Sequence, residues 1–132
     1  MESINLISST IRRIDHDIII ELEDGTHLFI PKSHQEKLNT FIDHKVQFGI
    51  RPEFISLADD TDEFNICNGL LTSLDEYNGV QLLRFKIAKE EVSSRVTDNR
   101  ITSNYIGKKV RFNFDTFFGH IFEQETQVNI TI

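Results

Sequence analysis

The sequence predicts an all-β fold built from many short strands, with one short helix. Short segments in which apolar and polar residues alternate recur along the chain, and tight-turn dipeptides stand between them at Asp24-Gly25 and Asn78-Gly79. Alternation with a period of two is typical of half-buried strands, and these dipeptides supply the positive φ that a tight hairpin requires. Only one stretch has a helical pattern. Many short strands favour a small closed barrel.

The central stretch, Lys45–Ala58, has alternating apolar residues on both sides of a break at Arg51-Pro52-Glu53. Pro52 has no N–H to donate, so the first strand must end or bend there. A glycine inside a strand, as at Gly49, usually marks a bulge or the close approach of another backbone. Arg51 and Glu53 are two residues apart, so on an extended segment their side chains could form a pair or share a partner.

In the N-terminal part, Ser9–Leu22 is expected to form two strands about a polar break at residues 15–17. A third strand, His27–Ile30, should follow the Asp24-Gly25 turn and stop at Pro31. The helical pattern covers Ser33–Thr40, with Ser33 as N-cap and Glu36 completing a capping box.

In the second half, Phe64–Leu74 and Val80–Ile87 are expected to pair as a hairpin through Asn78-Gly79. Lys89–Asn104 is polar and has no clear period, so we interpret it as a long loop with room for a helical turn. Val128–Ile132 should form a last strand.

Composition sets limits on function. The chain has 132 residues, 27% charged residues and a net charge of −7, which argues against binding nucleic acid or an anionic membrane. Cys67 is the one cysteine, so it has no partner for an internal disulfide. The sequence has neither an apolar run of membrane-spanning length nor the pattern of a signal peptide, so we expect a cytoplasmic location.

No catalytic, cofactor or metal site is predicted. The five histidines have neither i, i+4 nor His-x-His spacing, and no nucleophile elbow surrounds a serine. The acidic run at residues 59–63 lacks the glycine-containing spacing of a calcium loop and is interpreted as a solvated linker. The phosphate-binding loop of an ATPase is also missing.

Two motifs resemble one known family. Gly49-Ile50-Arg51-Pro52-Glu53 resembles the motif of the transport-associated OB-like (TOBE) domain, which follows the ATPase domain in sugar importers of the maltose and glycerol-phosphate type. The segment from Gly107 to Gln127 resembles the closing pattern of that domain, with Gln127 in place of a glycine. The closing matches are Gly107, Val110, Phe112, Phe114, Asp115, His120, Phe122, Glu125 and Thr126.

This resemblance implies an OB-like barrel, with two small interleaved β modules, that spans residues 1–132 without the ATPase domain that normally precedes it. It implies an accessory domain without catalysis of its own, on an ATP-binding subunit at the inner membrane face. The partners implied are the ATPase domain, a twin copy and, in some relatives, a regulatory protein, with the permease contacted only indirectly. His120 is expected to fix a turn by hydrogen bonding. The chain would be an excised domain or a stand-alone copy.

Two other functions compete with this interpretation. A related OB-like family binds oxyanions such as molybdate and carries a Ser-Ala-Arg-Asn type signature before a glycine, whereas here only Asn65 and Asn68 precede Gly69. An OB-fold nucleic-acid binder would need a basic groove with stacking aromatics, but the chain is acidic and has only two basic pairs, at residues 12–13 and 108–109.

Phe117 and Phe118 form the candidate interface. They fall in a turn that is usually polar in the resembling family. Neighbouring side chains in a turn point in different directions, so we expect at least one of the two to be exposed. We interpret this exposed aromatic as a contact with a second copy or a regulatory protein.

Overall fold

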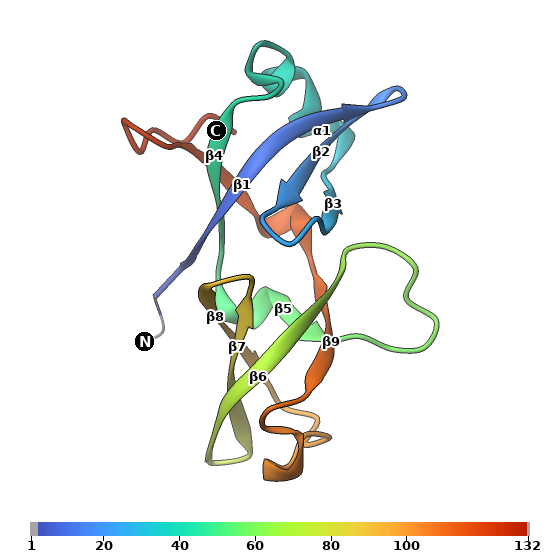
Figure 1. Cartoon of the computed structure of the whole chain (residues 1–132), viewed down its shortest axis with the longest axis vertical. Coiled ribbons are helices and arrows are strands. Elements are labelled where there is room, and N and C mark those ends of the chain that lie inside the picture. Colours follow the sequence, from blue (N-terminus) through green and yellow to red (C-terminus); the bar gives the residue numbers. More distant parts are fainter. Residues whose placement is uncertain (1–2, 132) are drawn as a thin grey trace.

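The computed structural model describes residues 3–131 and contains two five-stranded antiparallel sheets, which lie one above the other in Figure 1. The first sheet has the order β10-β4-β1-β2-β3 and consists of β1 (Asn5–Ile14), β2 (Asp17–Leu22), β3 (His27–Phe29), β4 (Lys45–Ile50) and β10 (His120–Glu123). The second has the order β5-β9-β6-β7-β8 and consists of β5 (Ile55–Leu57), β6 (Ile66–Tyr77), β7 (Val80–Ile87), β8 (Glu90–Val96) and β9 (Lys109–Phe114).

The two sheets are interleaved in sequence, as expected. The chain leaves the first sheet after β4, builds the whole second sheet, and returns after β9 to add β10 beside β4. Each sheet curls into a small OB-like barrel, which we call the first and second barrel. Because both connections between the barrels run through the segments around Pro52 and Asp115, these two segments lie at the junction.

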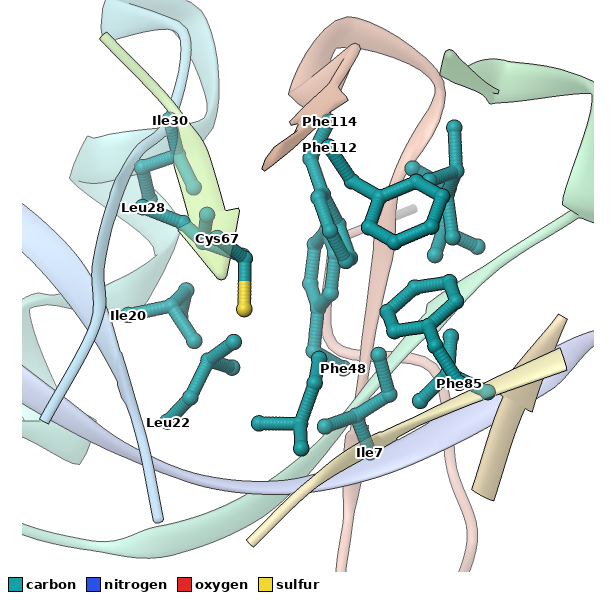
Figure 2. Close-up of a cluster of buried hydrophobic side chains, with 14 of the residues drawn as sticks. Ile7, Ile20, Leu22, Leu28, Ile30, Phe48, Cys67, Phe85, Phe112 and Phe114 are labelled. Atoms are coloured by element: carbon teal, nitrogen blue, oxygen red, sulfur yellow. The ribbon is translucent and has the colours of Figure 1, made fainter. Parts of the chain in front are cut away.

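One hydrophobic core runs through both barrels. Inward-facing residues alternate along the strands, and their side chains form a continuous buried cluster (Figure 2). Phe85 and Phe112 stack within the second barrel, with ring centroids 3.9 Å apart. Cys67 and Phe48 lie in the same cluster. Continuous burial across the junction predicts that the barrels unfold together.

Gly49 lies in a regular strand without a bulge. It pairs with Leu6 on one side and His120 on the other. A Cβ at this position would stand 2.6 Å from Cε2 of Phe122, so the close neighbour is an aromatic ring, not the backbone that we expected. The glycine therefore leaves the space that the Phe122 ring occupies.

The predicted hairpin turns are present. Asn78 and Gly79 have φ values of 52° and 79° and join β6 to β7, and Gly25 has a φ of 90° between β2 and β3. The break between β1 and β2 is a tight turn in which Asp15 has a φ of 55°. In each case a glycine, asparagine or aspartate occupies the left-handed region, where other side chains are strained.

The helix differs from the predicted capping box. A single α-helical turn, α1 (Lys32–Gln35), continues as the 3₁₀-helix η1 (Glu36–Phe41). Pro31 is the N-cap, and no side chain caps the end. Ser33 therefore lies inside the helix, because the fixed φ of Pro31 already starts the turn one residue earlier.

Two segments of the second half were predicted wrongly. Residues 90–96 of the expected loop form β8, which pairs with β7 over its whole length. The inward-facing residues of β8 are Val92, Ser94 and Val96, which are all buried. The buried Ser94 hydroxyl donates to the Ile55 carbonyl. The expected last strand at 128–132 is reduced to one bridge between Phe122 and Asn129, and its final residue lies outside the described part.

Among residues 3–131, no helix is long and apolar enough to cross a membrane.

Candidate binding groove at the junction of the barrels

The Arg51-Pro52-Glu53 motif lies where the chain passes from the first barrel to the second. Pro52 is buried and starts the 3₁₀-helix η2 (Pro52–Phe54), which ends β4 as predicted. The helical turn separates the side chains of Arg51 and Glu53, so the expected pair does not form. Arg51 is exposed and makes no ion pair with a described residue, and Glu53 lies 3.9 Å from Arg95 instead. Both partners of that contact are exposed, so it contributes little to stability.

The other motif residues take different positions. Asp115 follows β9 and is exposed, and Gly107 forms a turn with a φ of 88°. Phe122 packs over Gly49 as described above. His120 is exposed in β10 and its ring makes no hydrogen bond with a described residue, so its expected role in fixing the turn is not seen in this structure.

Phe117 and Phe118 belong to the 3₁₀-helix η4 (Thr116–Phe118), next to the junction. Phe117 is 64% exposed and Phe118 is 43% exposed, which confirms the expected exposure. Phe118 stacks on the half-buried Phe54 at a centroid distance of 4.2 Å, and Phe117 meets Phe118 edge to face at 5.2 Å. The three rings therefore form one group on the surface, in which Phe118 is packed on both sides and Phe117 is the most exposed ring.

A groove of about 710 Å³ opens beside this group, between the two barrels. Its walls come from the end of β3, from η2 and β5, from the loop between β5 and β6, and from the end of β9. That loop is the pale-green segment that projects from the junction in Figure 1. Glu53, Asp115 and Phe117, which the sequence had singled out for other reasons, all line this junction groove.

The floor of the groove is fixed by a clamp of hydrogen bonds between the barrels. The Phe29 N–H donates to Asn65 Oδ1 at 2.7 Å, and the Thr116 hydroxyl donates to the Phe29 carbonyl at 2.7 Å. Asn65 Nδ2 lies 3.4 Å from the same hydroxyl. Asn65 has a φ of 60°, which asparagine tolerates better than most residues. The clamp therefore joins three segments that are far apart in sequence.

The groove is acidic. Four carboxylates line it, from Glu53, Asp62, Glu63 and Asp115, and no lysine, arginine or histidine does within residues 3–131. The lining amide of Asn113 donates to the Phe64 carbonyl, and Asn65 and Thr116 are used in the clamp. Three of its polar side chains are therefore engaged in hydrogen bonds, while the four lining carboxylates give the groove a negative potential.

Exposed phenylalanines gather at this groove. Among residues 3–131 the exposed phenylalanines are Phe29, Phe64, Phe117 and Phe118, with exposed fractions between 37% and 64%. The first two meet edge to face at 5.5 Å and line the groove together with Phe117, and Phe118 adjoins them through its contact with Phe117. Single exposed apolar residues are ordinary, but a group of them around one groove is typical of a binding surface.

The other hollows and side-chain groups have fewer features of a binding or catalytic site. A second hollow of about 890 Å³ shares Glu53 and Ser56 with the groove, but it has mixed charge from Arg95 and a single aromatic, Tyr77. Within the described residues no group of three or more histidine, cysteine or acidic side chains has the geometry to hold a metal ion. Burial raises the pKa of the Cys67 thiol to about 12, so this thiol stays protonated and is a poor nucleophile.

Most groove residues were missed by the sequence analysis. The run at residues 59–63, interpreted there as a solvated linker, supplies Asp62 and Glu63 to the groove wall. Phe64 was assigned to a strand, although β6 begins only at Ile66. An available signal was Asn65 itself, because asparagine is common in turns and tolerates a positive φ better than most residues.

Comparison with known proteins is informative for solved structures only. No family model matches the chain, and no curated protein matches it. Among solved structures, the cytoplasmic molybdate-binding protein ModG, in a form with molybdate bound, superposes with a TM-score of 0.64 and 11% sequence identity, over 89% of this chain and 94% of that chain. At this identity the match shows the OB-like fold alone.

Proposed function

We propose that this chain is a non-catalytic binding domain, and that it binds another protein through the junction groove and the four exposed phenylalanines around it. We call these four residues, Phe29, Phe64, Phe117 and Phe118, the phenylalanine cluster. The single observation that carries this proposal is the gathering of exposed phenylalanines around one groove. Aromatic side chains are enriched at the centres of protein interfaces, where they supply large apolar area with little loss of conformational entropy. A rigid floor supports the groove, since the clamp fixes its backbone before any partner binds.

An accessory role in a sugar-importer ATPase is a finer form of this proposal, and it rests on the motif resemblance from Gly49 to Glu53 and after Gly107. In that form the partners are the ATPase domain, a second copy or a regulatory protein. Arg51 fits an interdomain contact, because it is exposed and without an ion pair to a described residue. The comparisons give no support to the transporter assignment beyond the OB-like fold.

Oxyanion binding is the second candidate, and the fold match supports it better than the importer role, because the matching protein ModG binds molybdate. The charge of the junction groove is unfavourable for it. An oxyanion needs converging N–H, O–H or cationic donors, whereas this groove presents four carboxylates. Of the Ser-Ala-Arg-Asn signature only the asparagine is present, since Asp62-Glu63-Phe64 precedes Asn65. An oxyanion would therefore have to bind outside the groove.

Photo-crosslinking in cells of the source organism tests the proposal. The photoreactive residue p-benzoylphenylalanine is placed at position 117, and at Tyr105 as a control, because Tyr105 is an exposed aromatic outside the groove. We expect a discrete protein adduct, with a partner or a second copy, from position 117 only. The same adducts from both positions, or none from position 117, would overturn the proposal.

The two candidate functions are separated by titration calorimetry with sodium molybdate. If the groove binds a protein and not an oxyanion, adding molybdate at micromolar concentrations should produce no heat of binding. If molybdate binds and the double variant Phe117→Ser, Phe118→Ser binds it equally well, the chain is an oxyanion-binding domain and the phenylalanine cluster is not its functional surface.

A further inference from the structure

We propose that the segment bound in the junction groove is cationic, with an arginine side chain of the partner protein held between phenylalanine rings and carboxylates. This inference rests on the proposed function and names the chemistry of the partner. It follows from the composition of the groove wall, which combines aromatic faces, carboxylates and an absence of basic side chains among the described residues.

The aromatic walls offer ring faces on which a cation can bind. Phe29 comes from β3 and Phe64 from the loop between β5 and β6, and Phe54 and Phe117 come from η2 and η4. A cation within about 6 Å of a ring centroid is attracted by the negative face of the ring. Arginine suits such a site better than lysine, because its planar guanidinium stacks on rings and is less strongly hydrated.

The carboxylates supply the complementary charge. Glu63 and Asp115 are exposed, and their carboxylates make no hydrogen bond or ion pair with a described side chain. Glu53 has only the 3.9 Å contact with Arg95. These groups are free to accept paired N–H bonds from a guanidinium, which are the strongest hydrogen bonds that a carboxylate accepts in proteins. The net charge of −7 would also speed the encounter with a basic partner.

The other occupants fit less well. The junction groove of a second copy is acidic too, so two grooves facing each other would repel. A metal ion is disfavoured because the carboxylates that line the groove do not converge into a group with ligand geometry. A partner segment with arginine satisfies both features of the wall, whereas an apolar segment would leave the carboxylates unpaired and partly desolvated.

Fluorescence anisotropy with a labelled hexa-arginine peptide tests the inference on the whole chain. The groove variant Glu63→Gln, Asp115→Asn removes two charges without removing a hydrogen bond seen in the structure. The control variant Glu23→Gln, Glu125→Gln removes two charges from exposed residues outside the groove. We expect the groove variant to weaken binding about tenfold and the control to change it less than about threefold.

Phe117→Ser adds a test of the aromatic contribution. It should also weaken binding of hexa-arginine, while a hexa-lysine peptide binds the unchanged chain less tightly than hexa-arginine. If the groove and control variants lose affinity for hexa-arginine equally, the peptide binds by net charge alone and the inference is wrong. The inference is also wrong if hexa-arginine does not bind at millimolar concentration. If either of these occurs while position 117 still gives its crosslink, the cationic partner is wrong and the proposed function stands.

Discussion

Replacing Thr116 by valine should loosen the junction between the barrels. The substitution keeps the shape of the side chain and removes the hydroxyl, which is part of a residue only 6% exposed. The hydroxyl donates to the Phe29 carbonyl at 2.7 Å and is the neighbour of Asn65 Nδ2 at 3.4 Å. Both groups would lose this partner. The hydrogen bond to Phe29 is only partly buried and Phe29 is exposed, so its loss should cost about 0.5–1.5 kcal/mol, and the second contact is long enough to add little.

Thermal unfolding followed by circular dichroism measures this loss. About 4 °C per kcal/mol is a reasonable scale for a domain of this size, so the melting temperature should fall by about 2–6 °C. Thr97→Val is the matched control, because Thr97 is exposed and its hydroxyl makes no hydrogen bond with a described residue, and it should shift the melting temperature by less than about 2 °C. Equal shifts for both variants would refute the clamp as a source of stability.

Four further outcomes follow from the structure. Gly49→Ala should cost about 1–3 kcal/mol in the free energy of unfolding, because its Cβ would meet the Phe122 ring at 2.6 Å, and much of that loss should vanish when Phe122→Leu is added; an undiminished loss would place the strain elsewhere. Cys67 should react with a thiol reagent at pH 8 only after denaturation, since its pKa is raised to about 12, and fast labelling of the native chain would contradict its burial. Arg51→Ala should change the stability of the isolated chain by less than about 0.5 kcal/mol in urea unfolding, and a larger loss would point to a structural partner. Titration calorimetry with Mg-ATP should show no binding, because the sequence has no phosphate-binding loop, and micromolar affinity would contradict the proposal that the chain is an accessory domain.

The fold was largely predictable because turns and alternation are local signals. Asn78-Gly79 marks its hairpin by itself, and Pro52 ends β4 by chemistry that needs no tertiary context. Residues 90–96 were not predictable in the same way. Ser94 occupies an inward position only because the Ile55 carbonyl, 39 residues away, accepts its hydroxyl. A polar residue at a core position interrupts the apolar–polar alternation, so the strand cannot be recognised from the local sequence.

The groove was harder to predict because it is made by tertiary contacts. Asn65, Thr116 and Phe29 come from three separate segments, and no motif in the sequence links them to one another. The exposure of Phe117 and Phe118 could be inferred because they are adjacent in a turn. The sequence does not indicate that Phe29 and Phe64 lie near them. The expected Arg51–Glu53 pair failed for a related reason, since the turn of η2 replaces the extended geometry on which that expectation depended.

The most direct test of the central claim, that the junction groove binds a basic protein segment, is a two-dimensional NMR titration of the ¹⁵N-labelled chain. Hexa-arginine peptide and sodium molybdate are added in separate experiments. We predict that the peptide shifts the amide signals of Glu63, Asn65, Asp115, Thr116 and Phe117, which surround the groove, and that molybdate leaves these signals in place. Shifts confined to residues away from the groove, or groove shifts caused by molybdate, would contradict it.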